Sequence, residues 1–331
     1  MRGKEWLFLS LGVILFLGFL VGLSFVVPSE NWYRMPPGGS AAITVEIPQG
    51  SSAKDVARIL FNAGIVSNDT ELLGWMKRLG FDRSIKPGSY RIEPGSPWEV
   101  AMRLKMAFPE GRQITIIPGY DRIDLLKFFD LRTWELALKD DEAFFPPVRP
   151  ILPDEPWDRI AFLAPDTYFV GYGDETVRRL IRLASKAWWE RVGTHHTGLT
   201  KDRALSTATL ASIVEREAKL DRERPLMASV FVNRLNKGMP LQSCATVVYA
   251  WKLRGEKKTH LSFDDLKVTS PYNTYIQRGL PPGPIGIPGI QSWSAALAPA
   301  SSKFLFFRLG EGGSHRFSET FDEHVRNRHE K

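Results

Sequence analysis

Residues 210–218 read LASIVEREA and place two glutamates at the end of an apolar run. The apolar spacing predicts a helix over residues 203–219, and residues two apart on a helix point to different sides. Glu217 therefore shares its side with apolar residues one and two turns earlier, whereas Glu215 follows small residues. The apolar residues are Leu210, Ile213 and Val214, and the small ones are Ala208, Ala211 and Ser212.

The position of Glu217 after an apolar stripe favours a role in acid–base chemistry. A partly desolvated carboxyl group holds its proton to higher pH, and a protonated carboxyl can act as a general acid on a glycosidic oxygen. The alternative is that Glu215 and Glu217 are both surface charges, paired with Arg216, Lys219 or Arg222. Spacing alone favours that alternative, so the helix pattern nominates Glu217 without deciding its role.

Two later segments carry polar and aromatic side chains. Residues 270–289 contain too many prolines and glycines for a regular element, and such residues stiffen a backbone and permit close approach to a ligand. A loop that binds sugar rings and a purely structural loop are both open interpretations. The side chains suited to sugars are Tyr272, Asn273, Tyr275 and Arg278. Gln242 and Ser243 follow a helix expected over 223–237, ended by Gly238, and are predicted to lie near the glutamates.

Near the N-terminus, residues 6–27 form an uncharged apolar run of about 22 residues, enough to cross a bilayer as a helix. Arg2 and Lys4 precede the run and the first charge after it is acidic, so the positive-inside rule places residues 1–5 in the cytoplasm. A cleaved signal peptide is the alternative, but residues 24–27 lack its small-residue cleavage site. We expect a single-pass anchor in the cell inner membrane, with the remaining chain on the periplasmic, extracytoplasmic side.

After a tether rich in Pro, Gly and Ser at residues 28–42, the pattern predicts two domains of the α+β class. Residues 43–108 combine short strands with helices whose starts carry Ser caps, and they form a compact unit of about 65 residues. Residues 109–327 form a larger domain of helices with a modest sheet, which opens with a strand over residues 113–117.

Composition excludes several classes of function. The formal net charge is +7, but basic residues are spread along the chain without a basic, aromatic-interleaved helix, so no nucleic-acid partner is expected. Cys244 is the only cysteine, which rules out an intrachain disulfide and a multi-cysteine zinc site. Histidines at metal-ligand spacing and phosphate- or dinucleotide-binding motifs are absent from the sequence. We therefore expect neither a metal nor a cofactor.

Taken in chain order, the motifs between residues 165 and 317 resemble those of the YceG-like (MltG) family of endolytic murein transglycosylases. The motifs are PDTY (165–168), LASIVEREA (210–218), ERP (223–225), ASVFVNRL (228–235), GMPLQS (238–243), SPYNTY (270–275), GLPPGPI (279–285) and H-x-F (315–317). The 43–108 unit, with its KPGSY turn, resembles the LysM-like domain that usually precedes the catalytic domain of this family. Several long motifs in order make the resemblance specific.

The resemblance implies a reaction and its participants. The family cleaves the MurNAc–GlcNAc β-1,4 bond within nascent glycan strands and leaves 1,6-anhydro-MurNAc ends, with one glutamate as general acid and then base. That glutamate maps to Glu217, and Glu215 stays the alternative acid. The expected substrate-binding residues are Gln242, Ser243, Tyr272, Asn273 and Tyr275. The implied partners are peptidoglycan glycan strands, the membrane through one helix, and peptidoglycan synthases.

Two other functions and one departure from the family stay open. A LysM-type scaffold would bind glycans without cleaving them, and a lysozyme-like hydrolase would need a nucleophile or a water-activating base such as Asp166 or Glu215. The departure is Cys244-Ala245, which stands where the family commonly has Asp-Pro. The missing aspartate would either position substrate or only shape a turn.

Overall fold

The computed structural model describes residues 41–48, 50–107, 109, 111–173, 175–310 and 313–327. No helix in this part of the chain is long and apolar enough to cross a membrane, and the anchor predicted over residues 6–27 lies outside the described residues. The chain divides into two compact units, Met1–Glu110 and Gly111–Lys331. Each unit mixes helices with short strands, which confirms the α+β class.

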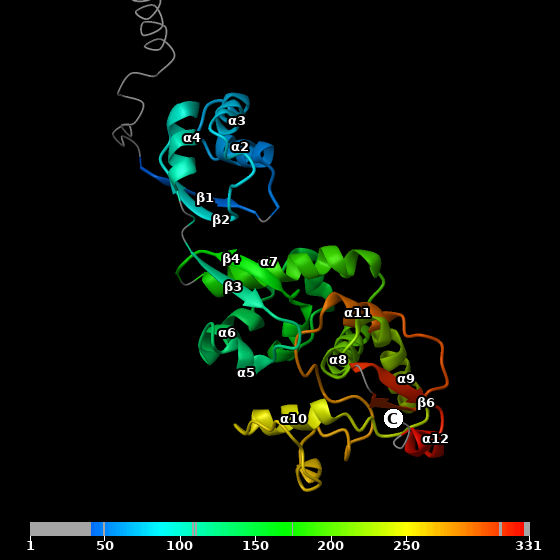
Figure 1. Ribbon diagram of the computed structural model, residues 1–331. Helices are drawn as coiled ribbons and strands as arrows, with labels where there is room; N and C mark the ends of the chain where they lie inside the picture. The colour runs from blue at the N-terminus through cyan, green and yellow to red at the C-terminus, as the bar shows by residue number, and fades with distance from the viewer. Residues whose placement is uncertain are drawn as a thin grey trace, which may run out of the picture. The chain divides into compact units, whose positions relative to one another are not determined.

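The described residues of the smaller unit form three helices and one pair of strands (Figure 1). Strand β1 (Ile43–Ile47) lies antiparallel to β2 (Gly88–Ile92). The helices are α2 (Ala53–Asn62), α3 (Asp69–Arg78) and α4 (Pro97–Met106). Ser caps at the helix starts are confirmed: the sequence left Ser51 and Ser52 open for the first helix, and Ser52 caps α2 while Ser96 caps α4, each in a capping box.

The larger unit contains two separate strand pairs in its described residues, where the sequence predicted one modest sheet. They are β3 (Arg112–Ile116) with β4 (Asp166–Val170), and β5 (Phe306–Leu309) with β6 (His315–Ser318). The α-helices are α5 (Arg122–Leu125), α6 (Leu131–Lys139), α7 (Thr176–Arg191), α8 (Lys201–Glu217), α9 (Arg224–Asn236), α10 (Cys244–Leu253), α11 (Ile290–Leu297) and α12 (Phe321–Arg326). The 3₁₀ segments are η2 (Asp141–Ala143), η3 (Pro146–Ile151), η4 (Pro156–Phe162), η5 (Gly193–His195), η6 (Asp221–Glu223) and η7 (Asp265–Lys267).

Helices α8 and α9 confirm the helices predicted over residues 203–219 and 223–237, with ends that differ by no more than two residues. Gly238 follows α9 with φ 62°, the left-handed conformation expected just beyond a helix end. The sequence did not predict α6 or α10. Helix α10 begins CATVV, where β-branched residues weaken helix propensity, so its helical state depends on packing.

Helix α8 lies at the centre of the larger unit and contacts α9, α10 and α11 (Figure 1). It is buried along most of its length, with Ala204, Ala208, Ala211 and Ile213 fully enclosed. Because Glu215 and Glu217 are in its last turn, the same packing that buries α8 determines where both carboxylates lie.

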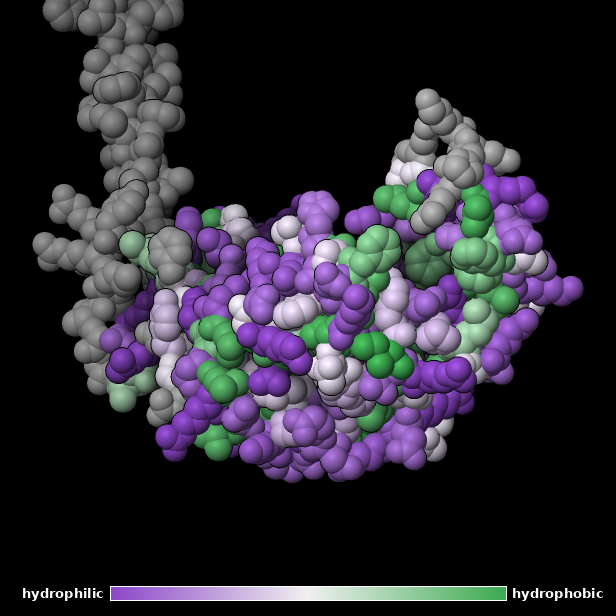
Figure 2. Space-filling model, turned by 90° about the horizontal axis from the view of Figure 1, so that it is seen from below, coloured by the Kyte–Doolittle hydropathy of each residue, from purple (hydrophilic) through white to green (hydrophobic). Residues whose placement is uncertain are grey.

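The surface is largely polar. On the face drawn in Figure 2, the described residues are mostly hydrophilic and the hydrophobic ones are scattered among them. Among the described residues, Phe263 is an apolar side chain that is 87% exposed. Single exposed apolar residues are normal in folded proteins, so these side chains do not indicate a binding surface.

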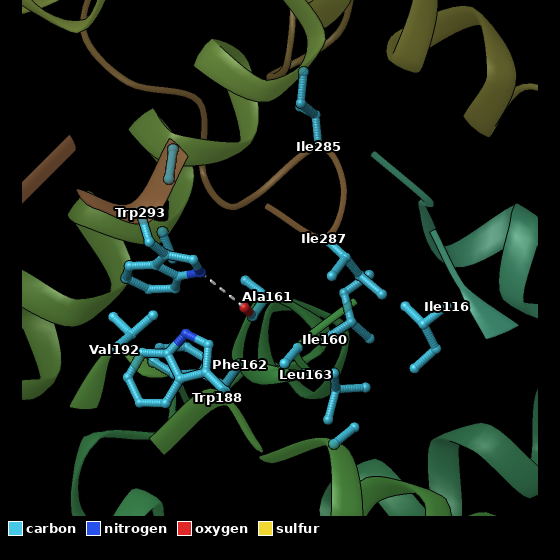
Figure 3. Packing of buried hydrophobic residues seen from close by; sticks show 14 of the residues in the cluster. Ile116, Ile160, Ala161, Phe162, Leu163, Trp188, Val192, Ile285, Ile287 and Trp293 are labelled. Atoms are coloured by element: carbon cyan, nitrogen blue, oxygen red, sulfur yellow. Dashed lines mark hydrogen bonds between the residues drawn. The ribbon is translucent and has the colours of Figure 1, made fainter. Parts of the chain in front are cut away.

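Three aromatic rings occupy the centre of the larger core (Figure 3). Phe162 of η4, Trp188 of α7 and Trp293 of α11 lie with ring centroids 5.0 to 5.5 Å apart, in tilted and edge-on arrangements. The Trp293 indole N–H donates to the carbonyl oxygen of Ala161 at 3.3 Å. This cluster joins α11 to η4, and the 270–289 loop leads directly into α11.

We predict that Trp293→Ala lowers the free energy of unfolding by about 3–5 kcal/mol, because it removes a fully buried aromatic side chain and leaves a cavity. Denaturant unfolding of the purified chain measures this. The control is Phe263→Ala, which removes an exposed ring and should change the value by less than about 0.5 kcal/mol. Equal effects of the two substitutions would contradict the assigned core.

Candidate functional site

Glu217 is the last residue of α8, and its half-buried carboxylate faces the start of α10. Oε1 accepts a hydrogen bond from the Ser243 hydroxyl at 2.5 Å and a longer one from the Ala245 N–H at 3.3 Å. No described residue donates to Oε2. One oxygen is therefore held by the protein while the other is left for a ligand.

Glu215 is the more deeply buried glutamate, with a side chain only 9% exposed. Its Oε2 accepts hydrogen bonds from the Gly289 N–H and the Ser292 hydroxyl, both at 2.8 Å, and its Oε1 lies 3.3 Å from Arg224 Nη2. The helix pattern predicted desolvation at Glu217. The structure instead buries Glu215 further, because the small residues on its side of α8 let neighbouring segments approach closely. Glu215 is thus engaged in holding the fold together.

Ser243 was predicted to bind substrate, and the structure gives it a different position. It is 1% exposed and its hydroxyl donates to Glu217. Gln242 beside it is exposed and has φ 51°, an uncommon left-handed conformation for a residue with a side chain. The Gln242 side chain is therefore accessible to a ligand, whereas the Ser243 hydroxyl is hydrogen-bonded to Glu217.

Asn273 is a clear correction to the sequence interpretation. It is fully buried, its amide nitrogen donates to the carbonyls of Leu266 and Val268, and its oxygen accepts from the Tyr275 N–H. These bonds tie the start of the 270–289 loop to the residues just before it. Its amide is not free to face a sugar ring.

The two tyrosines of this loop lie in different surroundings. Tyr272 packs edge-on against Tyr249 with centroids 5.0 Å apart, and burial raises its pKa to about 12. Tyr275 Oη lies 3.1 Å from Cys244 Sγ. Burial is the main reason that the Tyr275 pKa lies above its usual value, and the contact with Cys244 and the charge of Glu217 add to it. Tyr275 therefore stays protonated next to Glu217, as a hydrogen-bond donor.

Sequence reasoning missed Arg234, which fixes the turn before Ser243. Arg234 is 7% exposed and donates to the carbonyls of Leu241 at 2.9 Å and Leu305 at 2.6 Å. Burial lowers its pKa from the usual value, but an arginine remains charged. Its place in the ASVFVNRL motif was visible, yet nothing local revealed its distant carbonyl partners.

The cluster at the end of α8 thus combines one carboxylate with a free oxygen, a protonated tyrosine and an exposed amide, from Glu217, Tyr275 and Gln242. Such a group can hold and move one proton and can donate hydrogen bonds to a polar ligand. Within the described ranges, no three His, Cys, Asp or Glu side chains gather closely enough to hold a metal ion.

Residues 45–330 match the model of the YceG-like family. The chain belongs to this family. The match covers both structural units, and it confirms the resemblance carried by the ordered motifs.

Named relatives of this YceG-like chain come from several bacteria. A Bacillus subtilis protein named endolytic murein transglycosylase is 30% identical over 328 residues, covering 92% of this chain and 88% of the relative. A Streptococcus pneumoniae protein of the same name is 27% identical over 300 residues, covering 80% of this chain and 54% of the relative, so the chain spans about half of that protein. A crystal structure of a putative YceG-like protein from Listeria monocytogenes matches with a TM-score of 0.51 and 30% identity, covering 87% of this chain and 99% of that one.

The YceG-like motif GLPPGPI packs against a buried carboxyl group that sequence reasoning also missed. Asp158 of η4 is 6% exposed, and a Cβ added at Gly283 would lie 2.0 Å from its Oδ1. Only glycine permits this approach. Burial, and then the negative charge of Glu155, raises the pKa of Asp158 to about 7.

We predict that Asp158 makes the stability of this YceG-like protein fall between about pH 4 and about pH 7. Over that range the folded chain keeps a proton on Asp158 that the unfolded chain releases, and the full loss is on the order of 4 kcal/mol. Denaturant unfolding measures the free energy of unfolding at several pH values. For Asp158→Asn this free energy should fall less steeply with pH than for the parent chain, and the two should be similarly stable near pH 4. Parallel curves for the variant and the parent would contradict this.

We also predict that Glu215→Gln lowers the free energy of unfolding by about 3 kcal/mol, because it leaves the buried Arg224 guanidinium short of compensating charge. Thermal or denaturant unfolding measures the effect. The matched control is Glu190→Gln, which breaks an exposed pair with Lys186 and should cost less than about 0.5 kcal/mol. A fully stable Glu215→Gln variant would show that the buried pair is not structural.

Proposed function

We propose that this protein is an endolytic peptidoglycan lytic transglycosylase, which cuts the MurNAc–GlcNAc β-1,4 bond and leaves 1,6-anhydro-MurNAc ends. Family membership and the printed names of its bacterial relatives support this activity. The observation that carries the proposal is the geometry of Glu217, a carboxylate with one oxygen held by the protein and the other free of donors from described residues.

Glu217 performs both proton transfers in this proposal. Its carboxylic acid first gives a proton to the glycosidic oxygen as the bond from C1 to that oxygen breaks, and the GlcNAc side leaves as an alcohol. The resulting carboxylate then takes the proton of the MurNAc C6 hydroxyl while O6 bonds to C1. The acid is regenerated and no water is consumed. Tyr275, protonated beside Glu217, can donate a hydrogen bond to the sugar.

The structure disfavours the hydrolase alternative. A hydrolase needs a second carboxylate as nucleophile or base, and the sequence offered Asp166 and Glu215. Asp166 forms an ion pair with Arg191 on α7. Glu215 is paired with Arg224 and bound by two further donors. Because both carboxylates are occupied, neither is a good nucleophile, and one-glutamate chemistry fits the site better.

The remaining parts of the proposal concern placement. We propose that residues 6–27 anchor the chain in the cell membrane, with the larger unit on the extracytoplasmic side near peptidoglycan synthases. We propose that the smaller unit is a LysM-like glycan-binding domain. Its half-buried Trp75 and Trp98, with ring centroids 5.1 Å apart, are aromatic surfaces of the kind that pack against sugar rings.

We predict that Glu217→Gln lowers the rate of anhydro-end formation by about 10³-fold, because an amide cannot give up or accept the transferred proton. The full-length chain is incubated with purified glycan strands, and the new ends are identified by mass spectrometry. Glu190→Gln, an exposed change on α7, is the control and should cleave normally.

Other results would contradict the proposal in different ways. Reducing ends in place of anhydro ends would mean hydrolysis. A folded parent chain that binds strands without cutting them would mean a scaffold. Cleavage that survives in Glu217→Gln would remove Glu217 from the reaction.

A further inference from the structure

The two oxygens of Glu217 are not equivalent, because both of the protein's donors go to Oε1. The Ser243 hydroxyl and the Ala245 N–H converge on this oxygen at 2.5 and 3.3 Å. A carboxyl group that shuttles one proton needs one oxygen to carry it, and the other oxygen can be fixed without hindering the transfer. In this arrangement Oε1 is fixed by the protein, and Oε2 is available to carry the proton.

Both donors belong to the start of α10, where a helix has unpaired N–H groups. Ser243 is the N-cap residue, but its hydroxyl makes no bond to its own helix and points to Glu217 instead. The carboxylate of Glu217 accepts the N–H of Ala245, the second residue of α10. Glu217 thus caps α10 from outside, and the positive end of the helix dipole favours the negative charge at this place.

Ser243 is itself held from behind by two buried threonines. Its N–H donates to Thr274 Oγ1 at 3.0 Å, and its carbonyl accepts from Thr246 Oγ1 at 2.7 Å. The two threonine hydroxyls lie 2.9 Å apart, and both residues are fully buried. Because Thr274 precedes Tyr275, this network joins the fixed oxygen of Glu217 to the loop that presents the tyrosine.

Ala245 contributes through its backbone, which makes its identity important. A proline at this position would have no N–H to donate. The second donor to Oε1 therefore exists in this chain because residue 245 is not proline. Ala245 thus supplies Glu217 with a hydrogen bond that a proline could not.

We propose that Ser243 and the Ala245 N–H are positioning groups that fix Oε1 of Glu217, so that Oε2 carries the proton in both steps. This inference rests on the proposed transglycosylase function. It assigns Ser243 a role in orienting the acid, in place of the contact with substrate that its motif suggested.

The test compares kcat and KM of the full-length chain for anhydro-end formation on glycan strands. Ser243→Ala and Ala245→Pro each remove one donor, and proline is tolerated in the first turn of a helix. We expect kcat to fall about ten- to a hundredfold for Ser243→Ala and about tenfold for Ala245→Pro, with KM within about twofold of the parent. Ser185→Ala, which removes a buried hydroxyl on α7, should leave both constants unchanged.

Two results would overturn the inference. A rise in KM with kcat unchanged would mean that Ser243 touches the substrate, and unchanged constants in both variants would mean that the contacts to Oε1 do not matter.

A double-mutant cycle tests the contact without using the reaction. The unfolding equilibrium constants of Glu217→Gln, Ser243→Ala and the double variant are compared with that of the parent. The effect of the double variant should differ from the combined single effects by about fivefold or more. Additive effects would contradict the contact itself. A parent chain that makes no anhydro ends would instead contradict the proposed function, so the two failures are distinguishable.

Discussion

A buried carboxylate is stable only when its charge is compensated, and that requirement at Glu215 organises the larger unit. Arg224 at the start of α9 pairs with it, while Gly289 and Ser292, around the start of α11, donate hydrogen bonds. One side chain of α8 thereby joins segments that are more than seventy residues apart in the sequence. The 270–289 loop is therefore anchored at Glu215, two residues before Glu217.

Glu215 and Glu217 are only two residues apart, yet their carboxylates lie in different surroundings. Glu215 points into the packed side of α8, and Glu217 ends the helix and faces the start of α10. The C-terminal end of a helix disfavours a negative charge, whereas the N-terminal end of a neighbouring helix favours it. Placing α10 at this end of α8 therefore stabilises a carboxylate that α8 alone would not.

The 270–289 loop lies beside Glu215 and Glu217. It is fixed by the hydrogen bonds of the buried Asn273 and by close contacts at two of its glycines. The amide of Asn273 donates to the carbonyls of Leu266 and Val268, just before the loop, and accepts from the Tyr275 N–H within it. Gly283 lies against the Asp158 carboxyl, and Gly286 against the carbonyl oxygen of Gly119, at distances that leave no room for a Cβ. A loop with this packing presents Tyr275 in one position, which a flexible loop could not do.

The sequence by itself determined the helices with strong caps and periodicity, the family, and the nomination of Glu217. These features depend on neighbours within one or two turns, so local patterns carry them. Only the tertiary structure decided that α10 is a helix, that Glu215 is the more deeply buried glutamate, and that the side chains of Ser243 and Asn273 bond to other parts of the protein. The contacts of Ser243 and Glu215 depend on partners 26 and 77 residues away, in the bonds from Ser243 to Glu217 and from Ser292 to Glu215. The partners of Asn273 lie within seven residues, but its burial depends on the elements packed around it. A polar side chain looks the same in sequence whether its hydrogen bonds end on a sugar or on a distant part of its own chain, and folding alone assigns the partner.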